Sequence, residues 1–137
     1  MHVRQLAKML GVSPDTVRYY TRIGLLDPKK SIENGYKFYN PNEQNRLRFI
    51  LSSRDLGFSV DDIKQIFHKA DEGESPCPTV RRLIDNRLHE TEQRFQDTMR
   101  LRARMHTAVE NWGDKPDKKP SGNVICHLID EFTKTPK

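Results

Sequence analysis

The first part of the chain contains two short segments in which apolar residues recur at helical spacing. In the first segment these residues are Val3, Leu6, Ala7 and Leu10. Gly11 is suited to end this helix. Ser13 then provides an N-cap for a second helix, which begins at Pro14 and ends at Gly24. Two short helices joined by a turn that contains glycine predict a helix-turn-helix.

The second helix is too short to form a core of its own. We expect Val17 and Tyr20 to face inward, with the Tyr20 hydroxyl still able to reach a phosphate. Thr16, Arg18 and Tyr19 are then the exposed candidates for contacts with base edges or phosphates in a major groove. The pattern therefore favours a recognition helix that is held by the first helix.

A β-hairpin is predicted directly after these helices. Asn34 and Gly35 are a strong signal for a two-residue turn, with residues 31–33 and 36–39 as the strands. A small hairpin beside a helix-turn-helix is typical of a wing that touches the sugar-phosphate backbone. The residues expected to make these contacts are Tyr36, Lys37 and Tyr39.

Two further helices follow the hairpin. The first runs from Pro41 towards Gly57, and the second begins after Ser59, which is a suitable N-cap. Their inward positions are predicted to be Leu47, Ile50, Leu51, Ile63, Ile66 and Phe67. Residues 71–77 then break the chain, which predicts a winged helix-turn-helix domain over residues 1–70 and a linker over 71–77.

A long helix is predicted over residues 78–112, where no glycine or proline follows Pro78. Its 35 positions correspond to about 52 Å. Spacing of four and three places nine residues on one seam, six of them apolar: Ile84, Leu88, Thr91, Phe95, Thr98, Arg102, Met105, Val109 and Trp112. Such a helix has little to pack on within so small a chain, so we expect it to pair with its copy in a coiled-coil homodimer.

The last part of the chain, residues 113–137, is predicted to contain a loop, a short helix and a tail. Proline, lysine and aspartate dominate residues 113–122, and residues 123–132 have a helical pattern. The apolar residues of this pattern are Val124, Ile125, Leu128, Ile129 and Phe132.

Charge separates the two parts of the chain. Residues 1–56 hold ten Lys or Arg and five Asp or Glu, whereas residues 57–137 hold fourteen of each. The whole net charge of +5 therefore lies in the N-terminal part. This asymmetry indicates a polyanionic partner, with double-stranded DNA as the first candidate.

Composition excludes several other classes. No apolar run approaches the length of a membrane span and the first residues do not match a signal peptide, so we expect a cytoplasmic protein without a membrane partner. Two cysteines are too few for a disulfide framework. No phosphate-binding glycine loop or set of nucleophile and base is present, so an enzyme is not expected.

Four segments together resemble the MerR family of bacterial transcription regulators, and in particular its metal-sensing branch. These are VSPDTVRYYTRIGLL, ENGYKFY, RLRFILSSRDLGFSVDDIKQI and the long helix after Cys77. The resemblance implies a mainly α fold: a winged helix-turn-helix domain, a dimerisation helix that forms an antiparallel coiled coil over residues 78–112, and a C-terminal sensor loop and helix. It also implies that an effector changes promoter DNA geometry so that RNA polymerase can use the promoter.

The resemblance also assigns roles to single residues. Arg18 and Tyr20 match recognition-helix contacts, Tyr36 and Tyr39 match wing positions, and Arg54 matches an arginine that contacts the DNA backbone. Lys37 stands where arginine is common, so the charge is kept but the bidentate fork is lost.

Cys77 and Cys126 match cysteines that metal-sensing members contribute from different subunits. The first cysteine of the family's binding loop would fall at Trp112, so the three-thiolate site of those members is not expected. Both cysteines lie at predicted helix starts, with Cys77 as N-cap and Cys126 in the first turn. A helix start stabilises negative charge and so favours a reactive thiolate.

Three kinds of effector fit this sensor end, in descending order. Zinc or a similar divalent ion would be bound by Cys77 and Cys126, with His127, Asp114 or Asp117 completing the ligands. Alternatively, the thiols would respond to oxidants or electrophiles. In the third reading an organic ligand binds beside Trp112. A rival from another class is an architectural DNA-binding protein without a sensor.

Overall fold

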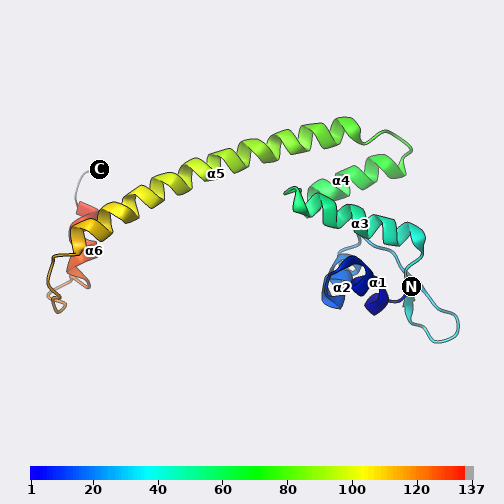
Figure 1. Ribbon diagram of the computed structural model, residues 1–137, viewed down its shortest axis with the longest axis horizontal. Coiled ribbons are helices and arrows are strands. Elements are labelled where there is room, and N and C mark those ends of the chain that lie inside the picture. The colour runs from blue at the N-terminus through cyan, green and yellow to red at the C-terminus, as the bar shows by residue number, and fades with distance from the viewer. Residues whose placement is uncertain (135–137) are drawn as a thin grey trace. The chain divides into compact units, whose positions relative to one another are not determined.

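The computed structural model describes residues 1–134 and is mainly helical (Figure 1). In chain order the elements are α1 (Val3–Leu10), α2 (Pro14–Arg22), β1 (Lys29–Lys30), β2 (Lys37–Phe38), α3 (Pro41–Asp55), α4 (Val60–Asp71), α5 (Cys77–Trp112) and α6 (His127–Lys134). The predicted order of two short helices, a hairpin, two helices and one long helix is confirmed. Among the described helices, none is both long enough and apolar enough to cross a bilayer.

The chain forms two compact units, divided between Leu88 and His89. The boundary falls inside α5, so residues 77–88 of this helix belong to the first unit. The predicted domain limits at residues 70 and 77 follow the ends of elements and stay predictions. The core of the first unit consists of Leu6, Ala7, Val17, Tyr20, Leu25, Leu26, Tyr39, Leu47, Ile50, Phe58, Ile63, Ile66 and Leu83.

Local capping determines the ends of the first two helices. Gly11 has φ 71°, in the left-handed region where glycine carries no side-chain penalty, and it ends α1 as predicted. The Ser13 hydroxyl accepts a hydrogen bond from the Thr16 N–H at 3.2 Å, which starts α2. Val17 and Tyr20 are buried, as the sequence pattern predicts.

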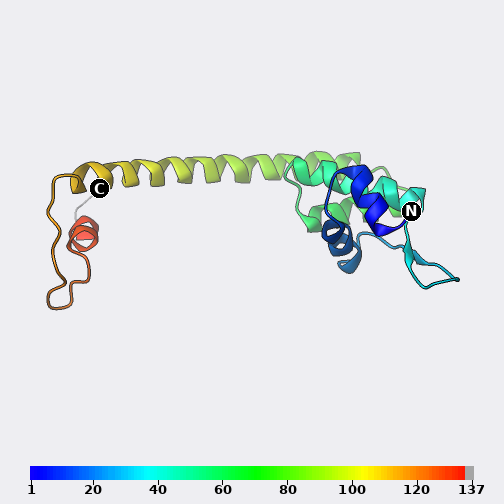
Figure 2. The same cartoon turned by 60° about the horizontal axis from the view of Figure 1, so that its bottom comes forward.

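The wing is a hairpin with shorter strands than predicted. Its antiparallel pairs are Lys29 with Phe38 and Lys30 with Lys37, so the predicted strand over residues 31–33 is wrong. Figures 1 and 2 both show the hairpin projecting from the helices of its unit.

The wing turn explains this difference. A two-residue turn of the predicted type needs positive φ at both central residues. Gly35 has φ 72°, but among the described residues no non-glycine residue has positive φ, and Asn34 is therefore excluded. The Ser31 N–H instead donates to the Tyr36 carbonyl at 2.8 Å, and the Gly35 N–H donates to the Ser31 carbonyl at 2.9 Å. Residues 32–35 thus form the loop.

The helices after the wing supply most of the remaining core. Leu47, Ile50, Ile63 and Ile66 are buried as predicted, whereas Leu51 and Phe67 are only partly buried at its edge. Glu43 is also buried, which the apolar pattern did not predict. Its carboxylate accepts a hydrogen bond from the Asp27 N–H at 3.0 Å, so the buried charge is compensated.

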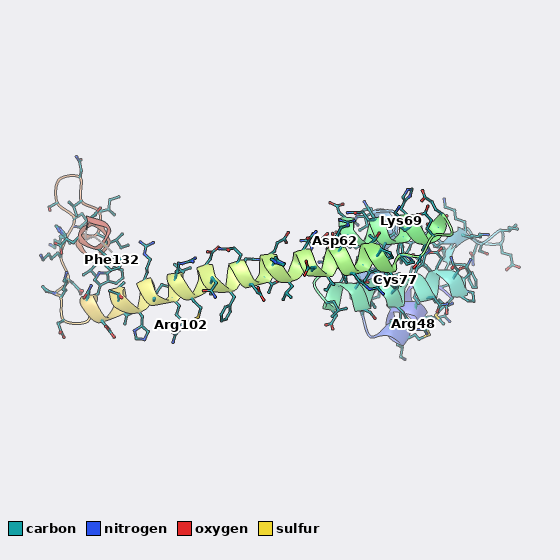
Figure 3. All side chains as sticks on the ribbon, turned by 90° about the horizontal axis from the view of Figure 1, so that it is seen from above. Arg48, Asp62, Lys69, Cys77, Arg102 and Phe132 are labelled. Atoms are coloured by element: carbon teal, nitrogen blue, oxygen red, sulfur yellow. The ribbon has the colours of Figure 1, made fainter. Side chains whose placement is uncertain are left out.

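A second buried carboxylate, Asp62, joins α4 to α5 (Figure 3). The residue is 2% exposed, and its oxygens accept from the Arg87 Nε at 2.7 Å and the Arg87 Nη2 at 3.2 Å. The Ser59 N–H adds a third hydrogen bond at 3.0 Å. Burial raises the pKa of Asp62, but the hydrogen bonds from Arg87 and Ser59 outweigh it, and the pKa is lowered overall.

The long helix and the terminal helix differ from the predictions at their starts. α5 begins at Cys77, one residue earlier than predicted, so Cys77 lies in the helix rather than at its N-cap. α6 begins at His127, so the predicted start at residue 123 is wrong. An isolated bridge between Ser121 and Val124 turns the chain there and keeps Val124 and Ile125 outside the helix.

The Asp62 ion pair leads to a prediction about stability. Asp62→Asn leaves the Arg87 guanidinium without its charged partner, and should lower the free energy of unfolding at pH 7 by about 2–3 kcal/mol. Because the folded-state pKa lies below the unfolded value of about 3.9, the contribution is present above that value and is lost as the pH falls through the folded-state pKa. Denaturant unfolding at neutral and acidic pH measures both effects.

Asp61→Asn is the matched control, because Asp61 is an exposed acid in the same first turn of α4. The control should change the stability by less than about 0.5 kcal/mol. An equal loss of stability in both variants, or a loss that does not shrink in acid, would contradict the assignment.

Candidate DNA-binding surface and effector site

The exposed face of α2 carries two arginines. Arg18 Nη1 lies 3.0 Å from Asp15 Oδ1, and the Arg18 side chain is 52% exposed, so the guanidinium is oriented but still accessible. Arg22 lies with its guanidinium carbon 5.5 Å from the centroid of the Tyr19 ring, a cation–π contact. Arg22 was not among the predicted DNA contacts. Its spacing of four from Arg18 on the same helix could have identified it.

The three other predicted residues of α2 differ in accessibility. Tyr19 is 41% exposed, whereas Tyr20 is 7% exposed and packs against it edge to face, with ring centroids 5.2 Å apart. Thr16 is partly buried, and its hydroxyl lies 3.0 Å from the Ser13 hydroxyl at the helix start. Tyr19 and the arginines are therefore the accessible groups of α2, and the Thr16 hydroxyl is already used in capping.

The wing adds positive charge to this surface. Lys29, Lys30 and Lys37 are all exposed, and Tyr36 is 67% exposed. Both strands are exposed along their length, so they present these side chains to solvent. The wing can therefore supply the phosphate contacts that were predicted for Tyr36 and Lys37, with two further lysines that the sequence analysis did not single out.

Tyr39 differs from its predicted role. Its side chain is 0% exposed, and its hydroxyl lies 2.7 Å from Thr21 Oγ1. Thr21 Oγ1 donates to the Val17 carbonyl at 2.9 Å, so it accepts its other hydrogen bond from the Tyr39 hydroxyl. Tyr39 thus anchors α2, and a direct contact of its side chain with DNA is wrong because the ring is enclosed in the core.

Arg54 is exposed at the end of α3, and one arm of its guanidinium is engaged. Nη1 donates to the Phe58 carbonyl at 2.9 Å, across the turn that leads to α4. This hydrogen bond fixes the position of the group while leaving its other N–H donors for a phosphate.

Cys126 and His127 lie together at the start of α6. The Cys126 carbonyl accepts from the Asp130 N–H at 3.0 Å, and the Cys126 N–H donates to Asp130 Oδ2 at 3.3 Å. Cys126 is therefore the residue that precedes the helix, not part of its first turn, and its side chain is partly exposed.

The His127 ring is oriented by the preceding loop. Its Nε2 lies 3.2 Å from the Lys119 carbonyl oxygen and 3.4 Å from the Ser121 hydroxyl. A carbonyl oxygen only accepts, so Nε2 carries the hydrogen in this contact and Nδ1 keeps its lone pair in the neutral ring. A backbone carbonyl on the far nitrogen is the usual support of a metal-binding histidine.

Trp112 joins the end of α5 to α6. Its indole N–H donates to the Leu128 carbonyl at 3.2 Å, and its ring meets Phe132 edge to face at 5.8 Å (Figure 3). Lys115 Nζ lies 3.5 Å from Glu131 Oε2 beside this contact. The position expected for a thiolate in metal-sensing members is therefore occupied by an aromatic residue that holds the terminal helix.

A complete metal site is not formed within one chain. Cys77 is exposed at the start of α5, and Asp114 and Asp117 are exposed in the loop before α6. Among residues 1–134, no group of three or more His, Cys, Asp or Glu side chains is placed to hold a metal ion.

Comparisons with known proteins agree with this arrangement. The family described as MerR HTH family regulatory protein matches residues 1–70, and the family described as MerR, DNA binding matches residues 44–108. The HTH-type transcriptional regulator ZntR of Escherichia coli K12 is 31% identical over 129 residues, which cover 93% of this chain and 89% of that protein.

Two further comparisons involve metals by name. The heavy metal-dependent transcription regulator 2 of Rhizobium meliloti is 31% identical over 134 residues, covering 96% of this chain and 86% of that protein. The crystal structure of PbrR691 from Ralstonia metallidurans in complex with lead(II) has a TM-score of 0.73 at 21% identity and covers 96% of this chain and 98% of that chain, which shows the shared fold. The chain belongs to the MerR family of helix-turn-helix transcription regulators and is not an enzyme.

Proposed function

We propose that this regulator binds promoter DNA as a homodimer through α2 and the wing, and that a thiophilic metal ion bound with the help of Cys126 controls it. The observation that carries the DNA-binding part is the surface of the first unit. There α2 exposes Arg18, Tyr19 and Arg22, and the wing exposes three lysines. Arginines on a helix suit base edges and phosphates, while flexible lysines suit phosphates alone.

Dimer formation is supported by unpartnered apolar residues on α5. Phe95, Met105 and Val109 are 62%, 58% and 69% exposed, and they belong to the seam predicted from the sequence. Exposed apolar residues at such spacing are typical of a coiled-coil partner surface. A second copy of α5, antiparallel as the family resemblance implies, would cover them and set the distance between two DNA-binding units.

This arrangement suggests control through DNA shape. Two linked winged units hold two half-sites, so a change in their relative orientation bends or untwists the DNA between them. An effector that binds one orientation more tightly shifts the population towards it. RNA polymerase at the same promoter would then read the altered geometry. An architectural protein without a sensor would bind the same DNA but would show no dependence on an effector.

Metal binding is favoured over the other effectors by the chemistry of the donors. Cys126 provides a partly exposed sulfur, and His127 next to it has a ring fixed by Lys119 with Nδ1 available. Because one chain does not gather enough ligands, the proposal takes Cys77 and Cys126 from different subunits, as the family resemblance implies, with His127, Asp114 or Asp117 as further ligands. A bound ion would supply a positive charge that holds these segments together.

The names of two relatives also support a metal effector, without indicating which metal binds here. One is called heavy metal-dependent, and one shared fold was solved with lead(II). Zinc suits tetrahedral sites of sulfur and nitrogen, and softer ions suit thiolates alone. Oxidation or alkylation of the same thiols is the second candidate, and an organic ligand beside Trp112 is the third.

Arg18→Ala should weaken binding to the specific promoter by about 1–3 kcal/mol, because a helix arginine that contacts a base or phosphate is lost. Arg100→Ala is the matched control, since Arg100 forms the same exposed three-residue ion pair, with Asp97, on α5. Fluorescence anisotropy with the promoter duplex measures both. Equal affinity of the Arg18→Ala variant and the wild-type chain would contradict the role of α2.

Native mass spectrometry of the reduced dimer with zinc, cadmium, copper(I) or lead(II) tests the metal. We expect stoichiometric binding of at least one ion that is lost in Cys77→Ser and in Cys126→Ser, because each variant removes a thiolate ligand. His127→Ala should weaken binding, and His106→Ala, an exposed histidine on α5, is its control. Metal retained in both serine variants, or bound by none of the proteins, would sink the metal proposal.

The single tryptophan provides an independent reading of the sensor end. Since Trp112 bonds to Leu128 and packs on Phe132, movement of α6 should change its fluorescence emission. We expect a stoichiometric metal to shift the emission of the wild-type chain and to leave Cys126→Ser unchanged. Binding detected by mass without any change in emission would show that α6 does not take part in the response.

A further inference from the structure

His2 makes contacts with the wing that none of the predicted DNA-binding residues accounts for. Its ring meets the Phe38 ring edge to face at 5.9 Å and the Tyr36 ring at 6.4 Å. Its Nδ1 lies 3.0 Å from the Lys37 carbonyl oxygen, so Nδ1 carries the hydrogen and donates it. One side chain therefore contacts three consecutive residues of the wing.

The same residue is fixed on the helical side. The His2 backbone N–H donates to Gln5 Oε1 at 3.0 Å, and the His2 carbonyl accepts from the Leu6 N–H at 3.0 Å. His2 is thus the N-cap of α1, and Leu6 lies in the core. These bonds orient the ring from a rigid helix and place it against the wing.

The wing has little other means of holding its position. Its ladder consists of two residue pairs, and a hairpin of this size is marginal in water when it stands alone. Both strands are exposed, and buried anchors occur only at its base, at Leu26 before β1 and Tyr39 after β2. Between these anchors, His2 supplies ring contacts and a hydrogen bond to β2.

We infer that His2 is a positioning residue for DNA binding: it holds β2 on the helix-turn-helix so that Tyr36 and the wing lysines reach the phosphates. The inference rests on the proposed DNA-binding function. His2 acts through the wing, and no contact of its own with DNA is required.

The consequence is a change in the number of phosphates contacted. Each phosphate neutralised by a lysine adds about 0.9 to the slope of log Kobs against log salt. A wing that is no longer held loses such contacts, so the slope becomes shallower. A variant that is only less stable reduces the fraction of active protein, which leaves the slope unchanged.

The test compares the full-length wild-type chain with His2→Ala, His2→Phe and His2→Asn on a labelled mixed-sequence DNA duplex, over about 50–200 mM salt. His2→Phe keeps a ring without the hydrogen bond, and His2→Asn keeps a donor without the ring. We expect His2→Ala to bind roughly tenfold more weakly at the lower salt and to have a slope shallower by about one to two. His2→Phe and His2→Asn should each recover part of the slope.

His68→Ala is the matched control, because His68 is an exposed histidine of α4 that pairs with Glu72. It should retain the wild-type slope. As a reading that does not involve DNA, the NMR order parameters of the Gly35 and Lys37 amides should fall in His2→Ala, below about 0.6. A folded His2→Ala variant with an unchanged slope would overturn the inference alone. A wild-type chain without salt-dependent DNA binding would overturn the proposed function and the inference together.

Discussion

The buried side chain of Tyr39 is the contact on which the geometry of the DNA-binding unit depends. Its hydroxyl bonds to Thr21 of α2, its N–H donates to the Met1 carbonyl at 2.7 Å, and its carbonyl accepts from Gln44 of α3 at 3.0 Å. One residue at the end of the wing thus connects the chain start, the recognition helix and the next helix. Because the ring is fully enclosed, these elements cannot shift separately without opening the core.

Much of the helical fold could be predicted from the sequence, because its signals are local. Ser13, Pro14 and Gly11 lie within a few residues of the helix ends that they determine, and the spacing of Leu47 and Ile50 reveals their buried face. The wing register was not predictable in this way. Asn34 is compatible with positive φ, and only the surrounding structure determines that it does not adopt it.

Interactions between distant residues account for what the sequence did not reveal. Glu43 and Asp62 look like ordinary surface acids, and their partners are the backbone of Asp27 and the side chain of Arg87. Tyr39 looked like a DNA contact because alternating aromatic residues suit an exposed wing. Its burial follows from its place at the end of β2, where the chain returns to the helices.

At the other end of the chain, the sequence correctly drew attention to Trp112 but could not give its partner. The indole occupies its N–H with Leu128 and its face with Phe132, so this part of the molecule is held by an aromatic contact rather than by a ligand. The terminal helix can therefore be in place before any effector arrives. Binding at Cys126 would then adjust an existing arrangement instead of creating one.

The joint between α4 and α5 also has a thermal consequence. An ion pair such as that of Asp62 and Arg87 becomes less costly to bury as temperature rises, since the hydration of charged groups becomes less favourable. The gain from apolar contacts levels off over the same range. On warming, the connection from the DNA-binding helices to the long helix should therefore weaken later than the apolar contacts around it.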